Sequence, residues 1–208
     1  LNGGGLNNDA TATLTHVTFS GNSAFNGGGG GLNNNGTASL TNVTFSGNTA
    51  AQFGGGLNNL NATATLTHVT FNGNTAGLSG GGIYRTAGTV LARASIVANS
   101  PSGGNCGGTI TNQGFNLSTD ASCSGFNQVA NVMLGPLANN GGFTQTHLPQ
   151  PGSPAIDLVA TGCPPPATDQ RGANRPVDGD GLGGAACDAG AVEYGAITSV
   201  VYLPLVRK

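Results

Sequence analysis

The chain has 208 residues, enough for one large domain or two small ones, and only 7% of them are charged, against about 25% in average soluble proteins. The formal net charge of −2 at pH 7 creates no field that would attract nucleic acid or an anionic membrane surface. Hydrophobic residues make up 37% of the chain and recur at regular spacing, which favours a packed fold over disorder.

Residues 1–100 are built from copies of one unit, of which GGGLNNNGTASLTNVTFSGNTA, residues 29–50, is an example. The copies align in four columns of apolar residues that recur every 25 or 26 residues. The columns are Leu6, Leu32, Leu57 and Ile83; Leu14, Leu40, Leu66 and Leu91; Val17, Val43, Val69 and Ala94; and Phe19, Phe45, Phe71 and Ile96. A fixed period of this length is typical of a solenoid, in which each unit packs on the next.

Each unit is predicted to be extended rather than helical. Threonine and asparagine are abundant, glycine triplets interrupt every copy, and no apolar stripe of period 3.6 is present. In TATLT the inward residues are Ala12 and Leu14, and in VTFS they are Val17 and Phe19, so the parity changes at a corner near residues 15–16. Three short strands and three turns in each unit of about 26 residues predict an all-β fold, a right-handed parallel β-helix.

An asparagine column follows the phenylalanine column. We predict that its amides turn inward and form a ladder in which each side chain bonds the next. The ladder residues are Asn22, Asn48, Asn74 and Asn99. A surface location of these side chains is the alternative.

The outward positions of the strand that carries Leu14 form a regular array of hydroxyl groups, with a step of about 4.8 Å between coils. The array consists of Thr11, Thr13, Thr15, Thr37, Ser39, Thr41, Thr63, Thr65 and Thr67, and we predict that it breaks at Val90 and Ala92. Ice-binding β-solenoids use threonines spaced in this way, although threonine is also a favourable outward strand residue in general. Ice binding is therefore a minor alternative function.

A further polar column, His16, Asn42, His68 and Arg93, is predicted to point into solvent beside the corner. His16 and His68 would lie two coils apart, about 10 Å, too far to share a metal ion. The regular coils contain one carboxylate, Asp9, whereas the polysaccharide-cleaving chemistry of many β-helices needs paired acidic groups. No catalytic residue is predicted.

Beyond residue 100 the period fades, and we divide the rest into irregular terminal coils at 101–160, a cap at 161–195 and a tail at 196–208. Eight of the 14 charged residues lie between Asp157 and Glu193. We predict that this charged, proline-rich segment covers the last open edge of the solenoid. A buried ion-pair network, rather than an active site, is predicted for Asp157, Asp169, Arg171, Arg175 and Asp188.

Four cysteines, Cys106, Cys123, Cys163 and Cys187, lack the CxxC spacing of a zinc or redox site. Two disulfides in an oxidising compartment are predicted, most simply Cys106–Cys123 and Cys163–Cys187, although four cysteines allow three pairings. The segment DGDG at 178–181 resembles a calcium loop, to which Asp178, Asp180 and Asp188 would contribute oxygens; a plain acidic turn is the alternative. No other cofactor is predicted.

Two stretches resemble known families. The pairing of GGGL with FSGN, as at 29–32 and 45–48, resembles the GGA[ILV] and FxxN repeats of polymorphic outer-membrane proteins, with glycine where alanine is usual. The segments LGPLANNGGFTQTHLPQPGSPAID at 134–157 and TDQRGANRPVDGDGLGGAACDAGAVEY at 168–194 are similar to the choice-of-anchor Q domain of bacterial secreted β-helix proteins. These resemblances imply a bacterial surface or secreted protein and imply no catalytic activity.

The sequence thus predicts a non-enzymatic structural or adhesive β-helix module, with a carbohydrate-binding or carbohydrate-active protein as the alternative. The chain begins inside a repeat and carries no signal peptide, so we expect upstream coils. Its open edge at residues 1–5 is expected to pair with those coils or with other copies of the chain, and surface proteins or glycans are further candidate partners. Neither nucleic acid nor a transmembrane segment is expected, since the longest apolar run, VVYLPLV, is too short to span a bilayer.

Overall fold

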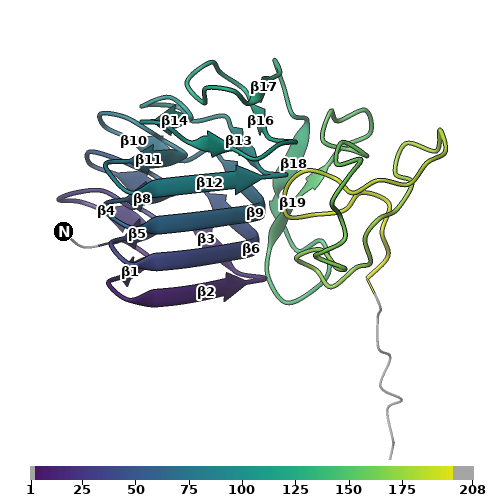
Figure 1. Ribbon diagram of the computed structural model, residues 1–208, viewed down its shortest axis with the longest axis horizontal. Coiled ribbons are helices and arrows are strands. Elements are labelled where there is room, and N and C mark those ends of the chain that lie inside the picture. The colour runs from purple at the N-terminus through teal and green to yellow at the C-terminus, as the bar shows by residue number, and fades with distance from the viewer. Residues whose placement is uncertain (1–2, 199–208) are drawn as a thin grey trace, which may run out of the picture.

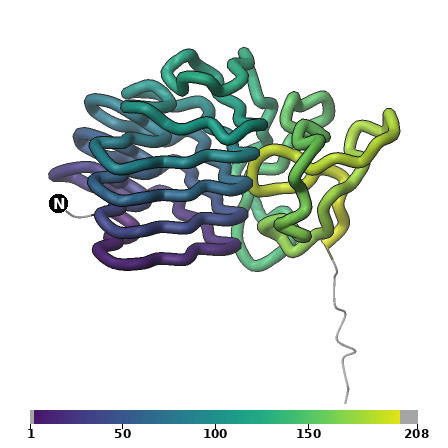
Figure 2. Tube along the Cα trace, in the orientation of Figure 1, coloured from purple at the N-terminus to yellow at the C-terminus, as the bar shows by residue number. Residues whose placement is uncertain are grey.

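The computed structural model describes residues 3–198, and its regular secondary structure in this range consists of strands alone (Figure 1). Parallel strands stack coil upon coil, which confirms the predicted β-helix. The tube in Figure 2 shows the coils as successive layers, with the segment after residue 130 standing beside them.

Three parallel sheets run along the stack. The first sheet contains β1 (Leu6–Asn8), β5 (Leu32–Asn34), β8 (Leu57–Asn59), β11 (Ile83–Arg85) and β14 (Cys106–Gly107), in that spatial order. The second contains β2 (Thr11–Thr15), β3 (Thr18–Ser20), β6 (Thr37–Ser46), β9 (Thr63–Asn72), β12 (Thr89–Arg93), β13 (Ile96–Ala98), β15 (Thr111–Asn112), β16 (Leu117–Ser118) and β17 (Asn127–Gln128). The third contains β4 (Ser23–Ala24), β7 (Thr49–Ala50) and β10 (Thr75–Ala76).

The core is a set of columns in which like side chains touch like. Phe19, Phe45 and Phe71 stack face to face, with ring centroids 4.8 and 4.6 Å apart. Leu40 pairs in register with Leu14 below it and Leu66 above it. Burial in such columns requires neighbours on both sides, so a single coil is not stable alone and the stack is the folding unit.

The fourth coil departs from the predicted columns by one residue. Leu66 pairs with Ala92 rather than with Leu91, and Leu91 points outward opposite Thr65. The space that the smaller Ala92 leaves is balanced by Val90, which is fully buried and replaces an alanine of the lower coils. The step of 26 residues is thus kept, and core volume is conserved by exchanging a large and a small residue within one strand.

The same one-residue shift changes the fourth member of the valine column and of the phenylalanine column. Phe71 pairs with Val97 and Thr70 with Ile96, so Ile96 lies on the outer side of the sheet instead of in the phenylalanine column. In the valine column Ser95 replaces the predicted alanine, and its Oγ accepts the backbone N–H of Val69 at 3.1 Å.

The asparagine ladder is present in three coils and does not include the fourth predicted member. Asn22 Nδ2 donates to Asn48 Oδ1 at 2.9 Å, and Asn48 Nδ2 donates to Asn74 Oδ1 at 2.8 Å. Asn99 is exposed and donates to the side chain of Asn72 instead. The register of the fourth coil puts residue 100 in the ladder position above Asn74, so Asn99 lies one residue before it.

Two further amide ladders, which the predicted columns did not include, run along the first sheet. They consist of Asn7, Asn33 and Asn58, and of Asn8, Asn34 and Asn59. Together the ladders pair most of their buried amide groups, and Asn58 Oδ1 is the buried ladder oxygen that has no partner.

The segment that follows residue 130 lies along the side of the stack (Figures 1 and 2). We call residues 131–198 the lateral unit; it contains the antiparallel hairpin of β18 (Leu134–Ala138) and β19 (Thr146–Pro149). The predicted cap is therefore misplaced, because residues 161–195 cover a flank of the coils, and the disulfide-closed segment around Cys106–Cys123 forms the upper turns. Residues 199–208, which include most of the predicted tail, fall outside the described range.

Candidate functional site

The lateral unit is attached along a column of corner residues with left-handed backbone conformation. These residues are His16, Asn42, His68 and Ala94, with φ between 49° and 58°. Asn and His tolerate this conformation better than most residues, which explains the first three members of the column. The predicted solvent-exposed column is wrong on two counts: its fourth member is Ala94 rather than Arg93, and Asn42 and His68 are 1% and 2% exposed because the lateral unit covers them.

The first two coils are joined to the lateral unit by Gln170. Its Nε2 donates to Thr18 Oγ1 at 2.8 Å, and its Oε1 accepts the hydroxyl of Thr44 at 2.7 Å. Asn42 Nδ2 also donates to the carbonyl of Thr168 at 2.7 Å. One glutamine therefore bridges two adjacent coils.

The third and fourth coils form hydrogen bonds with the irregular segment 188–191. His68 Nδ1 donates to the carbonyl of Asp188 at 3.0 Å. The N–H of Ala191 donates to Thr70 Oγ1 at 2.9 Å, and the N–H of Gly190 to the carbonyl of Ala94 at 2.8 Å. The lateral unit thus contacts four successive coils and holds them in register.

Ser46 and His147 form a hydrogen-bonded pair across the same contact. His147 Nε2 lies 2.9 Å from Ser46 Oγ, and its Nδ1 donates to the carbonyl of Gly135 at 2.7 Å. Burial lowers the pKa of His147, so the ring is neutral and Nε2 accepts the serine proton. A catalytic serine and its general base are hydrogen-bonded in the same way. Here, however, His147 is only 5% exposed, and the pair serves to join β19 to the second coil. No sequence signal pointed to it.

Two ion pairs are buried in the lateral unit. Arg171 Nη2 lies 2.7 Å from Asp169 Oδ2, and Arg175 Nη1 lies 2.7 Å from Glu193 Oε2. The sequence placed both arginines and Asp169 in such a network but missed Glu193. Asp157 has another role: its carboxylate accepts backbone N–H groups of the 179–186 loop.

Burial shifts the pKa values of this network. Desolvation raises the pKa of Asp188 to about 7, and the charge of Glu193 adds to the increase. Desolvation also raises the pKa of Glu193 and lowers that of Arg175, while the attraction between the two opposes both shifts. Burial lowers the pKa of His68 to about 3, with a further contribution from Arg175, so this imidazole is neutral at pH 7.

The predicted calcium ligands are only partly brought together. Oxygens of Asp157, Asp178 and Asp180 lie within 4.8 Å of one another, but Asp188 is not among them. The side chain of Asp188 is fully buried and accepts the backbone N–H groups of residues 157 and 194, so it is a structural acceptor. Asp157 takes its place in the acidic group, and calcium binding stays a prediction.

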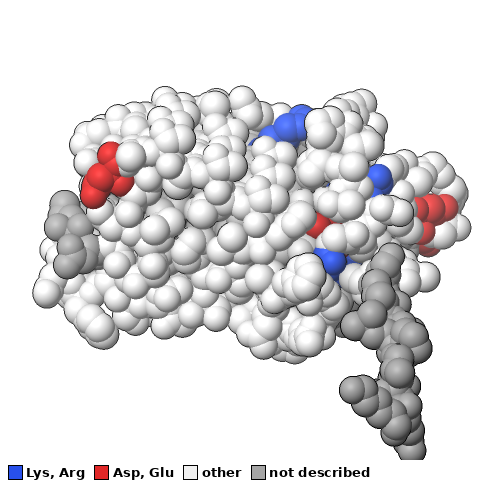
Figure 3. Space-filling view, turned by 90° about the horizontal axis from the view of Figure 1, so that it is seen from below, with Lys and Arg blue, Asp and Glu red and all other residues white. Residues whose placement is uncertain are grey.

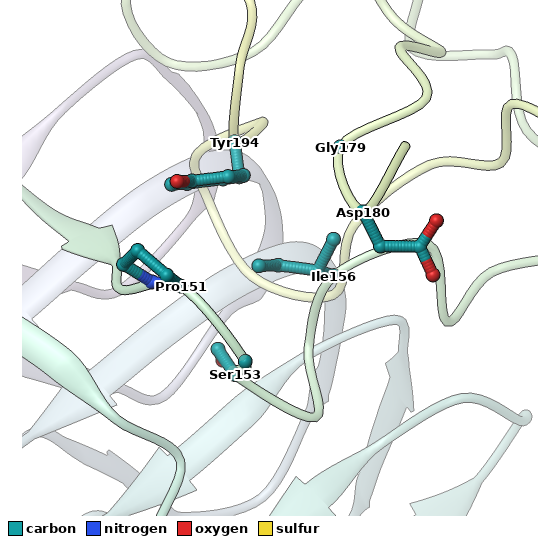
Figure 4. Close-up of a pocket in the computed structure, with 7 residues that line it drawn as sticks. Pro151, Ser153, Ile156, Gly179, Asp180 and Tyr194 are labelled. Carbon is teal, nitrogen blue, oxygen red and sulfur yellow. The ribbon is translucent and has the colours of Figure 1, made fainter. Parts of the chain in front are cut away.

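A cavity of about 490 Å³ lies next to this loop, lined by Pro151, Gly152, Ser153, Ile156, Gly179, Asp180 and Tyr194. Figure 4 shows the Tyr194 and Pro151 rings and the Ile156 side chain around one space, with the Asp180 carboxylate directed away from it. The hydroxyl of Ser153 donates a hydrogen bond to the carbonyl of Val132 at 2.6 Å. The cavity therefore combines polar and apolar surface and includes one aromatic ring.

The threonine array is exposed or half-buried, as its outward position requires, and its rows are in register. Thr63 pairs with Thr89, so the array reaches the fourth coil and ends there at Leu91 and Arg93. The predicted break at Val90 and Ala92 is wrong because both residues point inward. Ice binding by this array stays a prediction.

Comparisons of the chain with family models, curated proteins and solved structures found no match. Both predicted disulfides are formed, Cys106–Cys123 and Cys163–Cys187, and indicate an oxidising environment. Between residues 3 and 198, no helix is long and apolar enough to cross a membrane.

Proposed function

We propose that the protein is a non-enzymatic structural or adhesive β-helix module of a bacterial surface or secreted protein, and that it extends through the open edge of its first coil. The observation that carries this proposal is the uncovered lower face of that coil. Support for the location comes from the two disulfides and from the resemblance to bacterial secreted β-helix proteins.

The first coil leaves apolar side chains half-exposed that the next coil buries. Leu6 and Leu14 are partly exposed, whereas Leu32 and Leu40, which follow them in the same columns, are 0% exposed. Figure 3 views the molecule from this side, and the middle of the face over the first coil carries no Lys, Arg, Asp or Glu. An uncharged strand edge with apolar side chains is a template for further pairing.

The hydrogen-bonding groups of the edge specify what kind of segment would pair there. Asn48 Oδ1 accepts hydrogen bonds from both the backbone N–H and the Nδ2 of Asn22. Asn74 Oδ1 accepts the same two hydrogen bonds from Asn48. Asn22 Oδ1 occupies the equivalent position at the edge. A preceding coil with asparagine in this column would complete the pattern, which favours another β-helix coil of the same repeat as the partner.

The proposal is tested by adding a coil. A copy of residues 27–52 placed directly before residue 1 keeps the step of 26 residues between coils. We expect the extended chain to have a higher Tm, because Leu6, Leu14 and Val17 become buried. An extended chain with an unchanged Tm would show that the edge does not accept a coil.

Self-association is measured by sedimentation velocity over a wide range of protein concentration. We expect association of the chain, loss of association in Leu14→Lys, and no change in Leu78→Lys, where the same substitution is made at a side chain that is 63% exposed in a distant turn. A chain that remains monomeric at every concentration would refute association between copies while leaving the added-coil test unaffected.

The cavity beside Tyr194 favours carbohydrate binding as a second candidate function. Its volume of about 490 Å³ lies in the usual range of small-ligand sites, and an aromatic ring is a suitable surface for a sugar. Titration with soluble polysaccharides should give binding that Tyr194→Ala removes and that Phe143→Ala, at a fully exposed aromatic residue, leaves intact. Equal binding of the polysaccharide by both variants would show that this cavity is not the carbohydrate site.

A further inference from the structure

A second cavity, of about 280 Å³, opens on the solenoid between the first and second sheets. It is lined by Arg85, Gly88, Thr89, Thr109 and Thr111. In the fourth coil the chain takes seven residues to pass from Tyr84 to Leu91. In the fifth coil it takes only four residues to pass between their pairing partners, Gly107 and Thr111. The cavity exists because the fifth coil takes a shorter path around this corner and leaves the fourth uncovered.

Arg85 stands at the end of an asparagine ladder. It pairs in register with Asn59, whose Nδ2 donates to the carbonyl of Ala62, three residues further on, at 2.8 Å. Arg85 Nη1 makes the corresponding bond to the carbonyl of Gly88 at 2.9 Å. The longer side chain brings additional N–H groups to the corner, and its Nε, although shielded from solvent, has no hydrogen-bond partner.

The positive charge of Arg85 is not balanced by a carboxylate. The ion pairs within residues 3–198 are those of Arg171 and Arg175 in the lateral unit. Asp9 lies three coils below, about 14 Å away along the stack, and the Asp120 carboxylate accepts the backbone N–H groups of Asn105 and Ser122. The cavity therefore combines hydroxyl groups with a guanidinium group that has no ion-pair partner among the described residues.

We propose that this cavity binds a single oxyanion group: a carboxylate, sulfate or phosphate. The N–H groups of Arg85 Nη1 and Nη2 that are not bonded to Gly88 donate hydrogen bonds to such a group, and Thr89, Thr109 and Thr111 supply hydroxyl donors around it. A volume of about 280 Å³ is at the lower limit of ligand sites, so the ligand is an inorganic anion or one acidic sugar unit rather than a stretch of polymer. The site is independent of the open edge and of the Tyr194 cavity.

Backbone amide NMR shifts of residues 86–89 and 109–111 report on the site. Sodium sulfate and sodium glucuronate are titrated at constant ionic strength, with glucose as the neutral control. We expect saturable shifts with both anions, with a Kd on the order of 1 mM, and none with glucose. Tighter binding of glucuronate than of sulfate would identify the sugar acid as the preferred source of the oxyanion, and the reverse order would identify the free inorganic anion.

Arg85→Asn is the decisive variant, because it restores the ladder residue of the coil below and so preserves the fold. We expect it to abolish the anion-dependent shifts, and we expect Thr111→Val to weaken binding several-fold. Thr65→Val, at an outward strand position away from the cavity, is the matched control and should bind as the unmodified chain does. Shifts that do not saturate, that persist in Arg85→Asn, or that glucose also produces would overturn the proposal.

Discussion

Removal of the Asn48 side chain provides a direct test of the inner ladder. Its Nδ2 donates to the carbonyl of Phe19 at 2.9 Å and to Asn74 Oδ1 at 2.8 Å. Its Oδ1 accepts the N–H of Asn22 at 3.0 Å and the Nδ2 of Asn22 at 2.9 Å. Asn48 is completely buried, so water cannot replace these bonds.

The expected loss follows from the groups left without partners. In Asn48→Ala the carbonyl of Phe19 and the N–H of Asn22 lose their partners, and each unsatisfied buried group costs about 1–3 kcal/mol, so we expect the free energy of unfolding to fall by about 2–6 kcal/mol. Asn22→Ala, at the open edge, should cost about 1 kcal/mol. Asn99→Ala should cost about 1 kcal/mol, because Asn99 is exposed and outside the ladder and the loss comes only from its left-handed backbone at φ 56°, which alanine disfavours.

Urea unfolding measures these differences, provided that far-UV circular dichroism and tyrosine fluorescence give coincident transitions and that the m value is unchanged. Equal losses for Asn48→Ala and Asn99→Ala would refute the assignment of the ladder and the register of the fourth coil.

Three further predictions concern the lateral unit. The pKa of His68 is about 3 in the folded chain and 6.5 when unfolded, so the stability that its neutral ring contributes is fully present above pH 6.5 and is lost as the pH falls toward 3. The unfolding free energy relative to His68→Asn should therefore decrease by about 1.4 kcal/mol per pH unit across that window in urea titrations. A difference between the two proteins that stays constant with pH would contradict this prediction. Glu193→Gln removes the ion-pair partner of the buried Arg175 and should cost about 3–5 kcal/mol in the same assay, whereas a loss below about 1 kcal/mol would show that the pair is dispensable. Calcium should raise the Tm of the chain in calorimetry but not that of Asp178→Asn, and equal responses would exclude the acidic loop.

The sequence predicts the stack because its chemistry is local and repeated. Alternation in TATLT, a parity change at the corner and a glycine triplet in each copy determine strands, turns and period without reference to distant residues. The error in the fourth coil arose from aligning Leu91 with Leu66 as identical residues. The structure instead conserves the 26-residue step and the summed volume of Val90 and Ala92, a property of the pair that no single column reveals.

The lateral contact could not be predicted in the same way. The partners of His68 and Thr70 lie about 120 residues away, and the chain between them has no period that fixes their relative position. The charged residues of 157–193 indicated a network, but charge alone does not distinguish a cap on the end from a unit on the flank. A corner column of His and Asn with left-handed backbone is compatible with either exposure or coverage.

The contact of the lateral unit with four coils constrains how the gene can change. Duplication or deletion of a unit between Thr18 and Ala94 would displace the groups that meet Gln170 at one end and Gly190 at the other. A unit gained ahead of Thr18 disturbs neither. Variation in repeat number among descendants of this sequence should therefore accumulate upstream, while the four coils that contact the lateral unit are inherited together with it.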